Sequence, residues 1–357
     1  MSTKISVIRA GDLNEQQLHQ WAGFQDADPA LHSPYFCHQF TQAVAAVRDD
    51  VFVAIMEDAG RIVGFFPFQK GKLKIGRPVA GALSDFQAVI AMPDPQWDAQ
   101  ELVRKSGLSL WDFDHLLAMQ APFAAYIRKT ESSPYMDLSG GYESYARARR
   151  EVGSEQIKKA GNLGRKLERE IGPLEFVAHT ADEATFQLLL KWKSQQYLAS
   201  GTIDVFSYEW TVALLRRLLE IQTPEFAGML SVLSVKGKII AAHLGMRSKT
   251  TWHYWFPSYD HEFARFSPGL LLLLKMAEAA PVMGLNRIDL GKGESQYKDR
   301  LASGETAIAE GSVVVKPWAS IWRKVRRNTE SWSGSFGSVG AVPAKLLRRV
   351  DRKLRFR

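Results

Sequence analysis

The sequence predicts an α/β protein with two lobes, in which mixed, largely antiparallel sheets are flanked by helices. Three strand-like runs, residues 229–235, 239–247 and 251–259, are joined by Lys-Gly-Lys and Ser-Lys-Thr turns, and Ser-Pro-Gly then opens an apolar helix. A hairpin at residues 51–57 and 61–69, which turns at Asp-Ala-Gly, repeats part of this pattern. In a chain of 357 residues, of which 46% are apolar, the repetition predicts two related lobes with packed cores.

The first lobe is expected to span residues 1–140. Helical spacing of apolar residues predicts helices at residues 14–24 and 34–47, ahead of the hairpin. The segment 83–90 ends in a Pro-rich turn, and it is not followed by a helix that begins at a glycine and precedes a polar cluster. This lobe is therefore predicted to be degenerate and not catalytic. Residues 110–117 fit either a strand or the start of a helix.

The second lobe, residues 173–315, follows a basic connecting helix or helix pair at residues 141–172, which we expect to be interrupted near Gly161 and Gly164. This connector is either a solvated spacer or a cationic face that meets phosphates. A short strand and two helices are predicted ahead of the three strands, at residues 176–178, 181–199 and 208–221.

The start of the apolar helix has the residues of an anion site. A coenzyme that carries a pyrophosphate needs free backbone N–H groups at a helix N-terminus and room for close approach. Ser267 suits the N-cap, Pro268 the first helical position and Gly269 close approach, while Arg265 adds a nearby charge. Ordinary helices also begin with Ser-Pro-Gly, so the position directly after three strands is what favours the coenzyme. A short strand at residues 286–290 and a polar Tyr-Lys-Asp-Arg cluster follow.

The arrangement IAAHLGMR, then YWFPSYDHEFARFSPGLLLL, a helix and IDLGKGESQYKDRLA resembles a known family. It is similar to the bacterial GNAT-type acyltransferases associated with cellulose and exopolysaccharide synthesis, relatives of the FemAB-like aminoacyltransferases with two GNAT-like lobes in tandem. The resemblance is clearest over residues 170–315 and more diffuse over residues 1–140. The sequence departs from the usual GNAT enzymes at ARFSPGLL, which stands in place of their Gln/Arg-x-x-Gly-x-Gly/Ala phosphate loop.

The resemblance implies an N-acyltransferase that moves an acetyl or other acyl group from acyl-CoA, with acetyl-CoA as the expected donor, to an amine. The implied acceptor is an amino sugar of an extracellular or envelope polysaccharide. Two alternatives stay open. One is FemAB-like transfer of an amino acid from charged tRNA, and the other is a non-catalytic component of polysaccharide synthesis.

The candidate catalytic residues are His243, Tyr254, Asp260, Glu294 and Tyr297, and the candidate donor-binding residues are Arg265, Ser267, Gly269, Leu270 and Lys298. His243 and Tyr254 lie on adjacent predicted strands, whose hairpin can turn both side chains into a cleft. Asp260 and Glu294 are alternative bases, and Tyr297 can donate a proton to the leaving thiolate. Lys298 suits a phosphate or carboxylate. Both residues also have a non-functional interpretation: His243 can be a histidine packed in the core, and Lys298 can be a solvated surface charge.

The positive charge of the chain is concentrated in residues 316–357, which contain twelve Lys and Arg against two Asp and Glu, whereas the chain as a whole carries +8. The body is therefore close to neutral, which does not indicate a DNA-binding surface. Trp318, Ile321, Trp322 and Val325 share a helical face beside basic residues. This tail suits an anionic membrane surface, a nucleotide regulator or simple solubilisation.

The single cysteine, Cys37, excludes an intramolecular disulfide and is expected to be a small buried side chain. No His-Glu-x-x-His or Cys-x-x-Cys spacing occurs, so we expect no metal cofactor. The charged N-terminus has no apolar signal region. We therefore expect a cytoplasmic protein, peripheral at the inner face of the membrane if the tail binds lipid.

Overall fold

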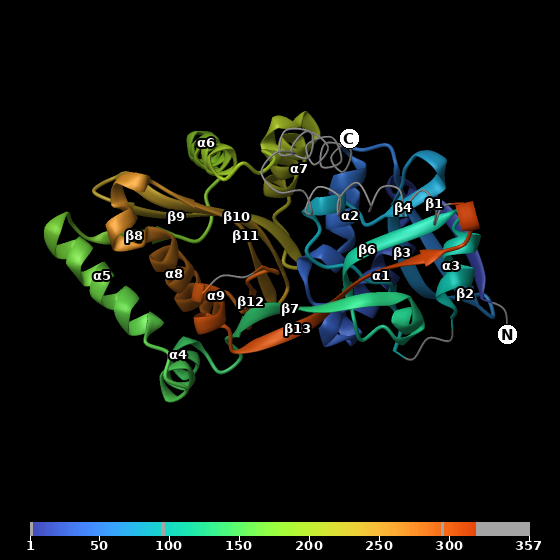
Figure 1. Cartoon of the computed structure of the whole chain (residues 1–357), viewed down its shortest axis with the longest axis horizontal. Coiled ribbons are helices and arrows are strands. Elements are labelled where there is room, and N and C mark those ends of the chain that lie inside the picture. Colours follow the sequence, from blue (N-terminus) through green and yellow to red (C-terminus); the bar gives the residue numbers. More distant parts are fainter. Residues whose placement is uncertain (1–2, 94–96, 294–295, 319–357) are drawn as a thin grey trace, which may run out of the picture.

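The computed structural model describes residues 3–93, 97–293 and 296–318. Within them, one mixed sheet runs through both lobes (Figure 1). In their order across the sheet, its strands are β1 (Lys4–Arg9), β2 (Val51–Asp58), β3 (Arg61–Lys70), β4 (Ile75–Arg77), β6 (Leu110–Leu117), β13 (Gly304–Val314), β7 (Ile127–Asp137), β12 (Arg287–Asp289), β11 (Thr251–Tyr259), β10 (Lys238–Ser248), β9 (Phe226–Val235) and β8 (Leu174–Val177), while β5 (Ile90–Ala91) pairs with β3.

Two long strands join the lobes. β7 pairs with β12 of the second lobe, and β13 lies between β7 and β6 of the first lobe. The last strand of the second lobe is therefore hydrogen-bonded into the first lobe (Figure 1). The predicted fold class, mixed and largely antiparallel sheet flanked by helices, is confirmed; among the described strands, the pairs β4–β6 and β11–β12 run parallel.

Helices cover both faces of this sheet: α1 (Glu15–Ala27), α2 (His38–Ala45), α3 (Ala99–Lys105), α4 (Tyr142–Glu151), α5 (Gln156–Glu170), α6 (Glu183–Ala199), α7 (Glu209–Glu220), α8 (Pro268–Val282) and α9 (Gln296–Leu301). Apolar residues of α1, α2, α6 and α7 share one buried cluster, which also contains the inward face of β10. Residues of α5 and α8 belong to a second cluster on the other side of β10 and β11. The sheet of the second lobe thus separates two packed layers.

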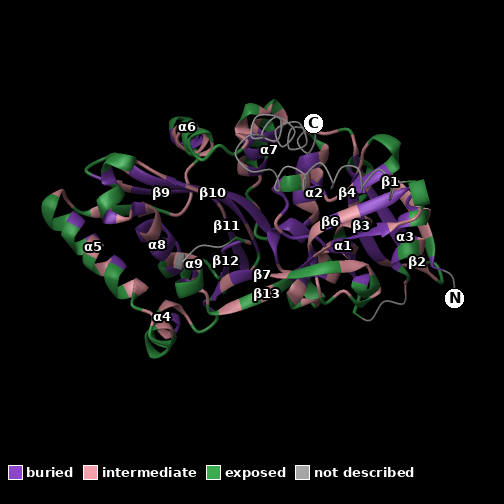
Figure 2. Ribbon diagram, in the orientation of Figure 1, coloured by how far each residue is buried: buried purple, intermediate pink, exposed green. Residues whose placement is uncertain are grey.

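Burial follows this layering (Figure 2). Every residue of β9 except Ser234 is buried, and so are eight residues of α8, because both elements lie between other layers. α5 packs one side on α8 and leaves basic residues exposed on the other. Cys37 is buried, as expected for a small apolar side chain.

The connector breaks at a different place from the one predicted. α4 ends at Glu151 and α5 starts at Gln156, because Gly153 adopts φ +79°, which favours glycine. Gly161 and Gly164 lie inside α5 instead. A Cβ at Gly164 would stand 3.4 Å from Leu271, so this glycine lets α5 lie close to α8.

Two further expectations are settled by the fold. Residues 110–117 form a strand, β6, and not the start of a helix. Of the helix expected at residues 34–47, the first part is a 3₁₀ turn at Pro34–Phe36 and only His38–Ala45 is α-helical. The Cys37 N–H closes the turn on the Pro34 carbonyl, and the extended backbone of Cys37 then separates the turn from α2.

Candidate active site

The site lies where two parallel strands part. β11 and β12 are paired at Thr251–Arg287, Trp252–Ile288 and His253–Asp289, and within the described residues their pairing ends there. β11 continues to Tyr259, whereas the N–H of Leu290 bonds to Pro134 on the far side. α8 connects the two strands, so its N-terminus lies at the end where they separate. Ligands commonly bind at such an edge of an α/β sheet.

The first turn of α8 is open. A Cβ at Gly269 would meet only Tyr259, at 3.5 Å, which is ordinary contact. Pro268 occupies the first helical position, as predicted. Ser267 stands at the N-cap, but with φ 52° and ψ 54° its side chain makes no capping hydrogen bond, contrary to expectation. Its carbonyl accepts from the N–H groups of Leu270 and Leu271 instead.

Arg265 and Leu270 flank this turn. The Arg265 guanidinium lies 3.2 Å from the Glu170 carboxylate of α5 and over the Phe266 ring, and its side chain is 65% exposed. A ligand phosphate would therefore have to compete with Glu170 for this arginine. Leu270 is half-buried against the core beneath α8.

Tyr254 and His243 lie beside the start of α8. The Tyr254 hydroxyl donates to the Gly269 carbonyl at 3.4 Å, and the His243 ring stacks on the Tyr254 ring with centroids 4.7 Å apart. His243 is fully buried, and its Nε2 accepts the N–H of Trp255 at 3.1 Å. Burial lowers the pKa of His243 to about 3. The ring is therefore neutral, and its basic nitrogen is already occupied, which favours a structural role over that of a base.

The reason lies in a β-bulge between β10 and β11. Their register shifts between Leu244 and Met246, and at Gly245 a Cβ would stand 2.2 Å from the His253 carbonyl and 2.6 Å from the His243 ring. The bulge takes the Trp255 N–H out of the regular ladder, and the imidazole supplies the missing acceptor. Gly245 is therefore required for close packing.

Two tyrosines meet on this face of the sheet. Burial raises the pKa of Tyr254, and the neighbouring Tyr297 raises it further; burial also raises the pKa of Tyr297. Both phenols stay protonated at neutral pH and can donate hydrogen bonds. Tyr297 belongs to α9, so the structure brings Tyr254, Tyr297 and the start of α8 to the same region.

Lys298 holds the loop after β12. Its Nζ donates to the carbonyl groups of Gly291 at 3.1 Å and Lys292 at 3.3 Å. Gly291 adopts φ +71°, and a Cβ there would lie 3.3 Å from the Asp85 carboxylate. Burial lowers the pKa of Lys298, although the Asp85 carboxylate acts in the opposite direction. The cation thus fixes the loop that follows β12 and acts on the nearby Asp85 carboxylate.

Asp260 and Glu294 complete the predicted set. Asp260 accepts the N–H of Glu262 and so caps the 3₁₀ turn His261–Phe266, and its carboxylate lies 3.1 Å from the Lys238 ammonium. This geometry favours a structural role for Asp260. Glu294 lies outside the described residues.

The prediction missed Asp85, which comes from the first lobe. Its Oδ2 accepts a hydrogen bond from His253 Nε2 at 2.9 Å. His253 is fully buried, whereas 27% of the Asp85 side chain is exposed. Burial acts to raise the pKa of Asp85, but the hydrogen bond from His253 and the nearby cations lower it below its ordinary value of 3.8. The carboxylate is therefore charged at neutral pH and remains partly exposed.

Lys193 of α6 is a second missed residue. Its Nζ donates to the Pro257 carbonyl of β11 at 3.2 Å and to Gln196 at 2.8 Å. Burial, and then the charge of Lys298, lower the pKa of Lys193 to about 8. The lowered pKa makes this amine easier to deprotonate than an ordinary lysine, which suits proton exchange with a substrate.

The two sides of the opening differ. His253 and Asp289 are register partners, so they face the same layer as Asp85 and the first lobe. Tyr254 is the next residue along β11 and packs with α8 on the opposite layer. The start of α8 thus lies on one face of β11, and the Asp85–His253 pair lies on the other.

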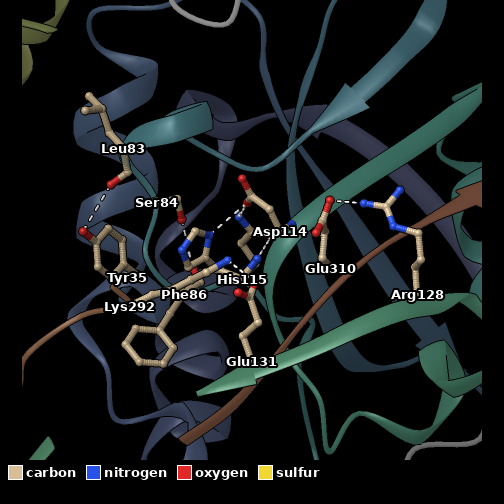
Figure 3. A network of polar contacts seen from close by, with 11 residues as sticks. Tyr35, Leu83, Ser84, Phe86, Asp114, His115, Arg128, Glu131, Lys292 and Glu310 are labelled. Atoms are coloured by element: carbon tan, nitrogen blue, oxygen red, sulfur yellow. Dashed lines mark hydrogen bonds and ion pairs between the residues drawn. The ribbon is translucent and has the colours of Figure 1, made fainter. Parts of the chain in front are cut away.

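Figure 3 shows the polar contacts at this junction. The Asp114 carboxylate and the His115 ring lie 3.1 Å apart on β6, and Lys292 forms an ion pair with Glu131 of β7. The Tyr35 hydroxyl donates to the Leu83 carbonyl, which holds the segment that contains Asp85. The Lys292–Glu131 pair ties the loop after β12 to β7 of the first lobe.

Within the described residues, no three His, Cys, Asp or Glu side chains gather in a way that could hold a metal ion. The helices in the described part of the chain include none with the length and apolarity needed to cross a membrane.

Comparison with known proteins identifies the second lobe. Residues 154–299 match the acetyltransferase (GNAT) domain. Solved structures share the fold over nearly the whole chain. FemX has 9% sequence identity and a TM-score of 0.59, and the match covers 90% of this chain and 99% of FemX. A tandem GNAT protein from the clavulanic acid biosynthesis pathway has 11% identity and a TM-score of 0.50, covering 88% and 99%.

A third similar structure is the L-PGS of Bacillus licheniformis, with 10% identity, a TM-score of 0.50 and coverage of 85% of this chain and 92% of that one. At these identities the structures establish a shared fold. No curated protein sequence matches the chain. Residues 154–299 thus match a GNAT acetyltransferase domain, and the tandem GNAT fold is shared over nearly the whole chain.

Proposed function

We propose that the protein transfers an acyl group from acyl-CoA to an amine, and that the acceptor is an amino sugar. The observation that carries the proposal is the opening between β11 and β12, with an uncrowded helix start on one face and the Asp85–His253 pair on the other. Two reactants can approach each other through such an opening from opposite sides.

The α8 side suits the donor. The pyrophosphate of CoA would bind at the first turn of α8, where backbone N–H groups and the helix dipole favour an anion. Gly269 leaves room for its approach. The basic face of α5, next to α8, adds positive charge for the remaining phosphate. The thioester would then reach the gap beside Tyr254 and Tyr297.

The junction side suits the acceptor. Asp85 presents a charged carboxylate to the opening, which can hold the incoming amine. The amine nitrogen attacks the thioester carbonyl, so a C–N bond forms and the C–S bond breaks. Lys193, in its neutral form, takes the proton that leaves the nitrogen, and Tyr297 donates a proton to the thiolate of CoA.

Acetyl-CoA as donor and a polysaccharide amino sugar as acceptor rest on the resemblance of residues 170–315 to the exopolysaccharide-associated acyltransferases. A second candidate is an aminoacyl-tRNA donor. The exposed basic residues along α4 and α5 favour it, because a polyanion longer than CoA could contact them. This surface lies on the same side of the sheet as α8.

Calorimetric titration of acetyl-CoA into the protein tests the proposal, with adenosine 3′,5′-bisphosphate as a probe of phosphate binding alone. We expect saturable binding that Gly269→Trp abolishes, because an indole at the first turn fills the phosphate site. Val282→Trp is the matched control, since Val282 is 89% exposed at the other end of α8. Binding of charged tRNA without binding of acetyl-CoA would favour the second candidate and reject the first.

We further propose that the basic segment, residues 316–357, holds the protein at an anionic membrane surface. Its Lys and Arg residues and the apolar helical face that its sequence predicts support this role, and each basic residue contributes about 1 kcal/mol at such a surface. Residues 319–357 of this segment lie outside the described part of the chain. Sedimentation with vesicles of phosphatidylglycerol and phosphatidylcholine checks it. Removing residues 319–357 should release the protein and leave acyl transfer intact, whereas equal sedimentation after truncation would reject this role.

A further inference from the structure

His253 of β11 forms a side-chain hydrogen bond between the two lobes. Its side chain has an exposed fraction of 0%, and its Nε2 lies 2.9 Å from Asp85 Oδ2 of the first lobe. Its Nδ1 is also buried, and in the described part of the chain it has no hydrogen-bond partner. A hydrogen on Nδ1 would therefore lack an acceptor, so Nε2 carries the hydrogen and donates it to the carboxylate.

Aromatic rings of the first lobe fix the orientation of the His253 ring. Tyr35 meets this ring edge to face with centroids 5.0 Å apart, and Phe86 meets it in the same way at 6.3 Å. The Tyr35 hydroxyl in turn donates to the Leu83 carbonyl at 3.1 Å (Figure 3). An imidazole enclosed in this way is held with Nε2 toward Asp85 before any substrate arrives.

The backbone around Asp85 is fixed as well. The Ser84 hydroxyl donates to the Phe86 carbonyl at 2.9 Å (Figure 3). The Gln87 side chain accepts from two backbone N–H groups of β6, each at 3.1 Å. Because the residues on both sides of Asp85 are held, one hydrogen bond from His253 is enough to set the direction of its carboxylate.

The other oxygen of this carboxylate is free. Although His253 occupies Oδ2, 27% of the Asp85 side chain is exposed. Among the described residues, no donor bonds to Asp85 Oδ1. A charged, partly exposed oxygen in a fixed position accepts strong hydrogen bonds from an amine, whose protonated form carries the opposite charge.

The basic side chains near Asp85 make their direct contacts elsewhere. Lys298 and His115 act on the Asp85 carboxylate electrostatically. The Lys298 Nζ donates to two carbonyl groups of the loop after β12, and the His115 ring lies 3.1 Å from the Asp114 carboxylate. The remaining titratable neighbours are phenols, whose pKa values burial raises: Tyr35 and Tyr197. The charge of Asp85 therefore remains available to an amine.

We propose that His253 is a positioning residue for the acyl acceptor: its Nε2–H holds Asp85 Oδ2, and Asp85 Oδ1 accepts an N–H of the acceptor amine. The proposal deepens the proposed function and rests on it for the reaction that follows. It also gives the first lobe, which was predicted to be degenerate, a part in binding the acceptor.

Variants of His253 separate positioning from packing. His253→Phe removes the Nε2–H but keeps a ring for the contacts with Tyr35 and Phe86, so the packing should be retained. His253→Gln places an amide N–H at a similar distance from the backbone and should restore the bond to Asp85. His19→Phe is the matched control, because His19 is exposed on α1.

The first measurement is acetyl transfer from acetyl-CoA to D-glucosamine. We expect His253→Phe to lower kcat/KM for D-glucosamine by about tenfold to a hundredfold, the loss of a hydrogen bond to a charged group, with the KM for acetyl-CoA unchanged. His253→Gln should recover most of this loss, and His19→Phe should cause none. In the Asp85→Asn background, His253→Phe should cause no further loss, because its effect passes through that carboxylate.

The pH profile adds a readout that a purely structural role would not change. The hydrogen bond from His253 lowers the pKa of Asp85, so without it the carboxylate binds a proton at higher pH. The acidic limb of kcat/KM for D-glucosamine should therefore move to higher pH in His253→Phe and return in His253→Gln. An unmoved limb in His253→Phe would contradict the positioning role.

Histidine NMR of the full chain gives a readout that needs no turnover. The Nε2–H signal of His253 is identified by its absence in His253→Gln, and D-glucosamine should shift it whereas D-glucose should not. Titration with acetyl-CoA separates the two proposals. A shift without acetyl-CoA binding would support the amine site and reject the proposed function. Acetyl-CoA binding without a shift, or with kcat/KM unchanged in His253→Phe, would overturn the role of His253 alone.

Discussion

His243 and His253 lie on adjacent strands, both fully buried, yet their hydrogen bonds give them different roles. His243 accepts a backbone N–H at the bulge, whereas His253 bonds to a partly exposed carboxylate from the other lobe. A histidine whose basic nitrogen accepts from the backbone stabilises the fold. A histidine that orients a carboxylate at an opening can influence chemistry.

We expect His243→Phe to lower the free energy of unfolding by about 1 to 3 kcal/mol, because the Trp255 N–H loses its acceptor while the stack on Tyr254 is kept. Urea unfolding measures this change. The pH profile of kcat/KM should keep its shape, since the pKa of His243 is about 3 and the ring is neutral throughout the working range. If His243→Phe instead removed the acidic limb of the kcat/KM profile and left the free energy of unfolding unchanged, His243 would be identified as the base.

Asp85→Asn should reduce turnover and lower the free energy of unfolding by about 1.5 to 3 kcal/mol at neutral pH, the range for a hydrogen bond to a charged group. The folded state lowers the pKa of Asp85 below 3.8, so its contribution is complete above that pH and is lost as the pH falls through the folded value. Unfolding measured from pH 7 to pH 3 should therefore show the two curves converging only below about pH 3.8. A difference that closes between pH 7 and pH 5 would contradict this assignment.

At the scale of elements, two glycines that sequence reasoning treats alike differ in their surroundings. A Cβ at Gly245 would overlap the His253 carbonyl at 2.2 Å, whereas a Cβ at Gly269 would make ordinary contact at 3.5 Å. Gly245→Ala should therefore destabilise the bulge by about 3 kcal/mol or prevent folding. Gly269→Ala should leave the melting temperature unchanged or slightly raised, because alanine favours the helix. Thermal unfolding of the pair checks both, and equal behaviour would contradict the bulge geometry.

α9 and the loop after β12 form a second unit at this scale. Lys298→Met should cut turnover at least tenfold and raise the KM for the donor, because the carbonyl groups of Gly291 and Lys292 lose the cation that holds the loop. Far-UV circular dichroism should stay unchanged, since α9 is short and lies at the surface of the second cluster. Arg300→Met, on the exposed side of α9, is the control that should leave turnover unaltered.

For the whole molecule, the shared sheet has a mechanical consequence. β13 pairs with β6 over Ile308–Val314 and with β7 over Gly304–Gly311, so neither lobe can unfold without breaking the ladder of the other. We expect a single calorimetric transition, with the same midpoint by near-ultraviolet circular dichroism. Two separated transitions would show that the lobes are independent units.

The residues that the sequence indicated and the structure gathers are those close to one another along the chain. Tyr254 and Gly269 lie within one βαβ unit, β11–α8–β12, and Tyr297 and Lys298 lie on α9 directly after it. Local patterns of turns and apolar spacing predict such a unit well. The same patterns gave the fold class and the order of strands β9, β10 and β11.

The sequence by itself therefore determined the α/β class and the strands followed by a Gly-opened helix, because these depend on local chemistry and short separations, and its motifs resemble the GNAT domain that residues 154–299 match. Only the tertiary structure decided that Asp85 pairs with His253, 168 residues away, and that β13 crosses into the first lobe. It also decided that His243 is an acceptor inside a bulge. Long-range pairings leave no periodicity in the chain, since they arise when separately formed elements bury their apolar faces against one another.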